Sequence, residues 1–310
     1  MDRVVLYAPA KVNLFLEVLH KRDDGYHTIE TLFEKIALFD KIEIAKAAGG
    51  ISISSTEESL PLGKENIAYR AVELLEERCG RPLGVDISIE KRIPISAGLG
   101  GGSSDAAAVL SGVNTLYDLM LESKELVLLG ERLGADVPLF IMDAPWAIGR
   151  ERGDVIKAIE SQMKLWHILF IPQASILSKE AYKWVDDDRR RESPGIQAAL
   201  GAIEQDDISL LGKSLHNDLE GLSFEKVSFL KEAKKALLDS GAAGVLISGS
   251  GPVLFGIFAS EEEVIASKKR VEERVGTGQH RFKVLVAPTL NNTKEAIFYG
   301  ARARKATRRK

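Results

Sequence analysis

Alternation of hydrophobic and polar residues predicts several strands in the first half of the chain. In residues 85–90, Val85, Ile87 and Ile89 alternate with polar residues, which is typical of a strand with one buried face. Residues 4–19 also read as extended, and a turn signal follows them. Further strands are expected at residues 27–38, 40–45, 51–54 and 146–149.

Hydrophobic residues three and four positions apart predict helices in the same half. The clearest helix begins at Asn66, a good N-cap residue, and ends near Cys79, just before Gly80. Two more helices are expected, from about Ser103 to 119 and from 123 to 133, where Gly134 stops the second one. Residues 135–138 are expected to form a tight polar turn.

The second half has a different order of elements: a strand, helices, a hairpin, a helix and a final strand. That order predicts an α+β sandwich of ferredoxin-like type. Strands are expected at 165–171, 245–247, 253–258 and 281–287, and helices at 178–182, from 196, at 223–239 and at 260–275. A charged stretch at 150–154 marks the expected boundary, so the predicted domains are residues 1–155 and 156–298.

The composition is that of an ordinary globular protein. Of 310 residues, 45% are hydrophobic and 28% are charged, and the net charge of −3 gives no reason to expect nucleic-acid binding. We find no leader-like segment and no apolar run of bilayer length. The lone Cys79 excludes an internal disulfide, and the five histidines lack metal-ligand spacing. We therefore expect a cytoplasmic protein without membrane contact, either a monomer or a homodimer.

The end of the chain is strongly basic, with six cationic side chains in residues 301–310. Such a segment is typical of a solvated, disordered tail. We predict that residues 299–310 form one, and contact with nucleic acid or a membrane is the alternative.

A glycine-rich loop is the strongest chemical signal in the chain. Four glycines fall within residues 98–102, and an alanine-rich helix is predicted to follow them. Glycine lets the backbone approach a ligand, and the unpaired N–H groups at a helix start attract anions, most often phosphate. The residues expected to bind phosphate are Pro94, Ile95, Ser96, Ala97, Gly98, Leu99, Gly100, Gly101, Gly102, Ser103 and Ser104.

This loop is not one of the common nucleotide-binding motifs. No Lys-Ser or Lys-Thr pair follows the last glycine, as a Walker A motif requires. Ser103 stands where the dinucleotide-binding fingerprint requires its third glycine. The catalytic motifs of protein kinases are absent as well.

Lys11 and Asp136 are candidate catalytic residues only because the chain also has a phosphate loop. Taken alone, a lysine in a strand is usually a surface residue, and an aspartate in a turn usually bonds its own backbone. Phosphoryl transfer gives the two a shared purpose. A carboxylate can accept the proton of the acceptor hydroxyl, and an ammonium group can stabilise the charge that develops.

Five motifs in the same order resemble those of the GHMP kinases, a family of small-metabolite kinases. They are PAKVNLFL at 9–16, DGYHTIETLF at 24–33, PISAGLGGGSS at 94–104, GADVP at 134–138 and SGSGP at 248–252. The resemblance implies a ribosomal-protein-S5-like first domain and a ferredoxin-like second domain. It also implies ATP as co-substrate with Mg²⁺, and Lys11 and Asp136 as the catalytic pair.

Within this family, the motifs are most similar to those of kinases that act on the 2-hydroxyl of a CDP-linked methylerythritol, in the non-mevalonate route to isoprenoids. The resemblance implies that Tyr26 stacks on cytosine, His27 hydrogen-bonds the edge of the base, and Tyr182 is the second stacking aromatic. It further implies substrate contacts at Asn13, Gly249 and Ser250. Without the resemblance, residues 26–27 could simply follow a turn and pack on the core, and residues 248–252 could simply form a hairpin turn.

Several alternatives stay open at this stage. The chain could be another GHMP kinase, for homoserine or a mevalonate-type alcohol, or a non-catalytic nucleotide- or metabolite-binding module on the same fold. The magnesium ligands are also open: Ser103 or Ser104 could hold the ion, or the triphosphate could carry it with water. Residues 149–154 depart from the family pattern, and residues 217–220 match it without an assigned role.

Overall fold

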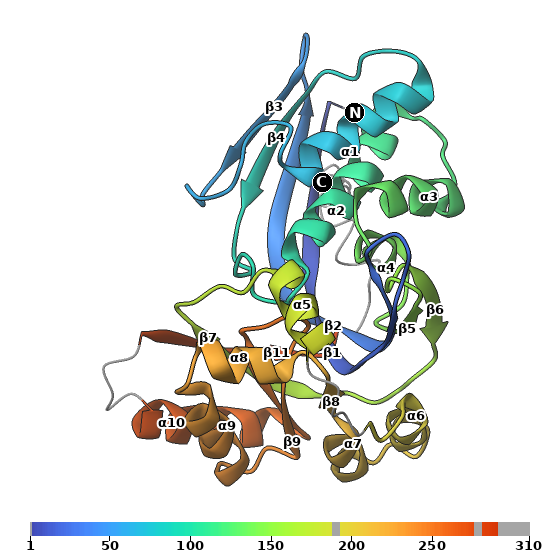
Figure 1. The fold of residues 1–310 in the computed structure, drawn as a ribbon. Coiled ribbons are helices and arrows are strands. Elements are labelled where there is room, and N and C mark those ends of the chain that lie inside the picture. Colours follow the sequence, from blue (N-terminus) through green and yellow to red (C-terminus); the bar gives the residue numbers. More distant parts are fainter. Residues whose placement is uncertain (1, 188–192, 276–280, 291–310) are drawn as a thin grey trace.

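The computed structural model describes residues 2–187, 193–275 and 281–290, and it has an upper and a lower part in Figure 1. The predicted tail at 299–310 lies outside these residues. The first part contains β1 (Arg3–Lys21), β2 (His27–Lys46), β3 (Ile51–Ser55), α1 (Ile67–Cys79), β4 (Val85–Glu90), α2 (Gly101–Tyr117), α3 (Ser123–Leu133), α4 (Val137–Ile141), β5 (Trp146–Arg150) and β6 (Val155–Ile159). The second contains β7 (Trp166–Pro172), α5 (Ser178–Asp187), α6 (Ile196–Glu204), α7 (Ile208–Ser214), β8 (His216–Asn217), α8 (Glu220–Lys226), α9 (Leu230–Asp239), β9 (Gly244–Ile247), β10 (Leu254–Phe258), α10 (Glu261–Val275) and β11 (Phe282–Pro288).

The first sheet is built on two very long antiparallel strands. Its order is β3-β4-β2-β1-β8, with β5 paired to β2 and β6 paired to β5. Because β2 is 20 residues long, different parts of it pair with β4 and with β5. Helices α1, α2 and α3 cover one face of this sheet (Figure 1). The predicted alternation in residues 85–90 is confirmed, because Val85, Ile87 and Ile89 are buried in the core below these helices.

The second sheet confirms the ferredoxin-like prediction. Its order is β11-β7-β10-β9, so its four strands, numbered along the chain, lie in the order 4-1-3-2. Helices α9 and α10 pack on one face, where Leu237 and Val264 contact a core around Phe170. The other face packs against β1 and β2 through a core that includes Phe15 and Phe255. The two sheets therefore share one buried interface.

The first sheet extends past the boundary predicted at residue 155. Strand β6 covers Val155–Ile159 and pairs with β5, so the sheet continues to Ile159. The division into residues 1–155 and 156–298 itself stays a prediction. None of the helices within the described residues is both long and apolar enough to cross a membrane.

The helix ends predicted from capping residues are confirmed for α1. The side chain of Asn66 accepts a hydrogen bond from the backbone N–H of Ala68, and Gly80 ends the helix with φ +67°. Glycine adopts this left-handed conformation without a steric penalty.

Several predicted boundaries were wrong. The runs 27–38 and 40–45 form one strand, because the buried Asp40 accepts hydrogen bonds from the backbone of residues 92 and 93 instead of making a turn. Helix α2 begins at Gly101 rather than Ser103, and the expected helix at 223–239 is divided into α8 and α9. The expected turn at 135–138 leads directly into the short helix α4, since proline fits the first turn of a helix. Helix α5 continues past residue 182 to Asp187, and strands β6 and β8 were missed.

A buried polar network joins the two sheets. His167 on β7 lies with Nε2 3.0 Å from Glu34 on β2 and with Nδ1 3.0 Å from the carbonyl of Ala287. The hydroxyl of Thr289 donates to the other oxygen of Glu34 at 2.6 Å. His167 and Glu34 are both fully buried, so His167 Nε2 and the Glu34 oxygen beside it depend on each other for a hydrogen bond.

Removal of one partner of this network should destabilise the fold strongly. We expect Glu34→Ala to lower the free energy of unfolding by about 3–5 kcal/mol, because His167 is then left buried without its partner. The double variant Glu34→Leu/His167→Leu should lose clearly less, because both polar groups are gone. Urea unfolding of the two variants measures this, and a double variant less stable than Glu34→Ala would contradict it.

Candidate active site

Lys11 and Asp136 lie next to each other although they are far apart in the sequence. Lys11 is in the middle of β1 and is only 3% exposed, and its Nζ lies 3.5 Å from Oδ2 of Asp136. Asp136 is the N-cap residue of α4, and its side chain is 30% exposed. A buried ammonium group needs an opposite charge. The partly open carboxylate supplies that charge and stays accessible to a ligand.

Asn13 orients the ammonium group of Lys11 from the same strand. Lys11 Nζ donates to Asn13 Oδ1 at 2.6 Å, and the amide Nδ2 of Asn13 donates to the hydroxyl of Thr31 at 2.8 Å. That hydroxyl donates in turn to the carbonyl of Phe15, beside an irregularity in the pairing of β1 with β2. Thr31 lies inside the motif at 24–33, but no feature of the motif singles it out.

The glycine-rich loop is held between β1 and the turn at 248–252. The backbone N–H of Lys11 donates to the carbonyl of Leu99 at 3.0 Å, and the hydroxyl of Ser248 donates to the carbonyl of Gly98 at 2.9 Å. Gly98 has φ +77°, and a Cβ there would lie 1.9 Å from the carbonyl oxygen of Ser248. No other residue fits at position 98. The loop is therefore placed relative to Lys11 by the backbone itself.

The start of α2 faces this loop, as the sequence predicts for an anion site. Gly100 is the N-cap residue with φ +72°. The N–H groups of residues 101–103 have no helical partners, because the first helical hydrogen bond runs from the N–H of Ser104 to the carbonyl of Gly100. The hydroxyl of Ser104 in this turn is buried without a hydrogen-bond partner. Together the loop and the helix start offer unpaired donors next to Lys11.

A buried charge cluster lies behind the loop. Lys91 donates hydrogen bonds to Asp40 and, at 2.8 Å, to Asp105 on α2. Burial raises the pKa of the Asp105 carboxyl group to about 8. The positive charge of Lys91 opposes this rise, and the negative charge of Asp40 adds to it. Asp40 also receives two backbone N–H groups, whereas Oδ1 of Asp105 has no partner. The ammonium group of Lys91 is thus shared by two carboxyl groups, and burial favours the protonated form of Asp105.

The turn at 248–252 reaches the catalytic candidates from the second half of the chain. A Cβ on Gly249 would lie 3.2 Å from Asn13 Oδ1 and 3.4 Å from Lys11 Nζ, so its backbone is in contact with this pair. The amide Nδ2 of Asn217 donates to the carbonyls of residues 247 and 249, which fixes the turn. This contact gives a structural role to the motif at 217–220. The hydroxyl of Ser250 lies 3.1 Å from that of Ser178 at the start of α5.

Two of the three predicted base-binding residues are in direct contact. The rings of His27 and Tyr182 stack with centroids 5.1 Å apart and planes at 16°. Burial raises the pKa of the Tyr182 hydroxyl, and the charge of Asp136 adds to the rise. Tyr26 stands apart: it is 58% exposed, and the guanidinium of Arg152 lies 5.3 Å from the centre of its ring. The three rings therefore do not form one sandwich in this structure.

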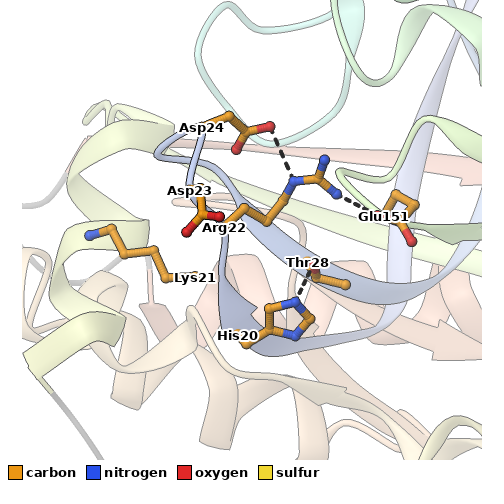
Figure 2. Close-up of a pocket in the computed structure, with 7 residues that line it drawn as sticks. All are labelled: His20, Lys21, Arg22, Asp23, Asp24, Thr28 and Glu151. Carbon is orange, nitrogen blue, oxygen red and sulfur yellow. Dashed lines mark hydrogen bonds and ion pairs between the residues drawn. The ribbon is translucent and has the colours of Figure 1, made fainter.

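A polar pocket of about 490 Å³ lies at the end of the β1–β2 hairpin (Figure 2). Arg22 in this pocket is paired with Asp24 and Glu151, so its charge is already compensated. His20 bonds Thr28, which is opposite it across the two strands. His27 and Lys21 form the next pair along the hairpin, and both side chains contact Asp186 on α5. None of the predicted site residues lines this pocket.

The described residues contain no group of three histidine, cysteine or acidic side chains that could hold a metal ion. Ser103 and Ser104 do lie in the first turn of α2, where the triphosphate of ATP is expected.

Two family models match the chain. GHMP kinases N terminal domain covers residues 66–144, and GHMP kinases C terminal covers residues 199–276. The 4-diphosphocytidyl-2-C-methyl-D-erythritol kinase of Syntrophomonas wolfei is 40% identical over 87% of this chain and 95% of that protein. The chain belongs to the 4-diphosphocytidyl-2-C-methyl-D-erythritol kinase family. As a GHMP kinase, it is an ATP-dependent small-molecule kinase, and the alternative of a non-catalytic module is wrong.

Solved structures agree with this membership. A crystal structure of 4-(cytidine 5'-diphospho)-2C-methyl-D-erythritol kinase matches 93% of this chain and 100% of that chain, with 33% identity and a TM-score of 0.75. Homoserine kinase from Cytophaga hutchinsonii has a TM-score of 0.76 over 94% of this chain and 96% of that chain, but it is only 22% identical. The second likeness therefore shows the shared α+β fold alone.

The proton on Asp105 should make stability depend on pH. Because its folded-state pKa lies above that of an unfolded aspartate, the folded state binds more protons between about pH 4 and 8. The free energy of unfolding then falls as pH rises through this window, by at most about 1.4 kcal/mol per unit. Asp105→Asn should remove this contribution and gain stability relative to the wild type as pH rises. Thermal unfolding at pH 5, 7 and 9 measures the difference, and a difference that does not change with pH would contradict it.

Proposed function

We propose that this enzyme transfers the γ-phosphoryl group of ATP to the 2-hydroxyl of 4-diphosphocytidyl-2-C-methyl-D-erythritol, in the non-mevalonate route to isoprenoid precursors. The contact between Lys11 and Asp136 beside the glycine-rich loop carries the phosphoryl-transfer part of the proposal. The names of the relatives and the His27–Tyr182 stack support the choice of substrate.

In this proposal, Asp136 is the proton acceptor and Lys11 the electrostatic stabiliser. The acceptor hydroxyl gives its proton to a carboxylate oxygen of Asp136 as its oxygen forms a bond to the γ-phosphorus, and the bond to the ADP oxygen breaks. Lys11 Nζ lies 3.5 Å from that carboxylate, so it can stabilise charge on the attacking oxygen and on the transferred group. Asn13 keeps the ammonium group in place.

The glycine-rich loop would bind the phosphates of ATP. Residues 94–104 offer backbone N–H groups, and the start of α2 adds the positive end of its dipole. When bound, Mg²⁺ would neutralise phosphate charge. The hydroxyl of Ser104, buried without a partner, or that of Ser103 fits a ligand role beside phosphate oxygens and water.

The cytidine end of the substrate would be bound at the hairpin between β1 and β2. His27 would hydrogen-bond the edge of the base, and Tyr26 and Tyr182 would stack on it. Because the rings of His27 and Tyr182 are already in contact, the base must enter beside that stack rather than inside it. Gly249 and Ser250 would contact the part of the substrate nearest Lys11, since Gly249 is packed against Lys11 and Asn13. We also propose a cytoplasmic location, in agreement with the single cysteine, and a monomer or homodimer without nucleic-acid partners.

The proton acceptor can be tested with a nearly isosteric variant. We expect Asp136→Asn to lower kcat by about 10²–10⁴, the usual contribution of a general base, with little change in KM for either substrate. Asp118→Asn is a matched control, because Asp118 lies at the far end of α2 with φ +52°, a conformation that asparagine tolerates. Wild-type kcat in Asp136→Asn would exclude Asp136 from the reaction.

The substrate can be tested against those of other GHMP kinases. ADP release measured with the CDP-linked alcohol, homoserine and mevalonate should give turnover only with the first, because the other two have no base for His27 to bind. Faster turnover of homoserine or mevalonate would overturn the substrate assignment, although the enzyme would remain a kinase.

A further inference from the structure

Asp186 on α5 bonds two residues of the β1–β2 hairpin at once. Its Oδ1 lies 2.7 Å from Nε2 of His27, and its Oδ2 accepts a hydrogen bond from Lys21 Nζ at 2.5 Å. Lys21 and His27 are directly opposite each other across the two strands, so both side chains point to the face that α5 covers. In Figure 2, the side chain of Lys21 extends away from that of Arg22, although both residues line the pocket.

These contacts determine where the proton of His27 lies. The hydrogen bond from Lys21, and then the one from His27, lowers the pKa of Asp186, so Asp186 is a carboxylate and can only accept. Nε2 of His27 must therefore donate, and in the neutral ring Nδ1 is left with a lone pair. No described residue is hydrogen-bonded to Nδ1, and Tyr182 covers one face of the ring.

We propose that Asp186 is a positioning residue that makes the enzyme choose cytosine over uracil, by holding the proton of His27 on Nε2. This inference rests on the proposed function, in which His27 binds the base. Cytosine presents an amino donor at C4, whereas uracil presents an oxygen acceptor there. The lone pair on Nδ1 accepts a hydrogen bond from the amino group and repels the oxygen.

Lys21 determines how the side-chain amide of an asparagine at position 186 would be oriented. An asparagine at 186 has a single side-chain oxygen, and Lys21 is only a donor, so the oxygen must face Lys21. The amide NH₂ then faces His27 and donates to Nε2, which moves the ring proton to Nδ1. In Asp186→Asn, His27 becomes a donor toward the base and favours uracil.

Two measurements follow this change. ¹⁵N NMR of the histidine rings should show the proton of His27 on Nε2 in the wild type and on Nδ1 in Asp186→Asn. With CMP and UMP as competitive inhibitors of ADP release, the wild type should prefer CMP. We expect Asp186→Asn to reduce that preference by about 5- to 150-fold, the range for one hydrogen bond gained or left unmade.

Matched variants separate this effect from a general loss of structure. Glu180 is on the same helix as Asp186 and forms an ion pair with Lys226 on α8, so Glu180→Gln removes that pair and should change neither measurement. In the double variant Lys21→Met/Asp186→Asn, the amide can turn its oxygen back to Nε2, so the preference for CMP should return. A further loss of that preference in the double variant would contradict the role of Lys21.

The inference fails if Asp186→Asn keeps the proton on Nε2 and keeps the preference of the wild type for CMP. A failure of the proposed function would give a different experimental result. If His27→Ala is inhibited by CMP as strongly as the wild type, then His27 does not bind the base at all, and the cytosine site lies elsewhere.

Discussion

The site depends on the compensation of one buried cation, the ammonium group of Lys11. At 3% exposure this group has lost nearly all contact with water, so its charge must be balanced by protein. The ammonium group donates a hydrogen bond to the side-chain oxygen of Asn13 at 2.6 Å, and Asp136 supplies the negative charge at 3.5 Å. The longer distance to Asp136 and the partial exposure of that side chain leave room for a substrate hydroxyl to approach the carboxylate. The same pair therefore accounts for the stability of Lys11 when it is buried, and it is the pair to which we assign the chemistry.

The placement of this pair requires both halves of the chain. Lys11 is on the first sheet, and the backbone of Gly249, which packs against it, comes from the turn between β9 and β10. The tight contact between Gly98 and Ser248 ties the glycine-rich loop to the same turn. Farther along the interface, Glu34 and His167 join the two sheets through buried hydrogen bonds. The candidate active site thus lies at an interface that is held together on both sides of Lys11 and Asp136.

The sequence predicts the local structure well where one residue type determines it. Asn66 and Gly80 end a helix by capping, and the alternation around Ile87 determines which side of β4 is buried. It fails where tertiary contacts decide. Asp40 resembles a turn residue but lies inside β2, because it is needed under Lys91, and the short strand β8 exists only through its pairing with β1. For the site, the motifs identify Lys11, Asp136 and the loop. They give no signal for Thr31 or Asp186, whose importance comes from distant partners.

The most direct test of this account is a double-mutant cycle on Lys11 and Asp136, measured as kcat for ADP release with the CDP-linked alcohol. Residues that act as one unit lose their function together, so their effects do not add. We expect Lys11→Met, Asp136→Asn and the double variant to have similar kcat values, each about 10²- to 10⁴-fold below that of the wild type. If the two losses multiply in the double variant, Lys11 and Asp136 act independently, and the account of the site as one charge-compensated pair is wrong.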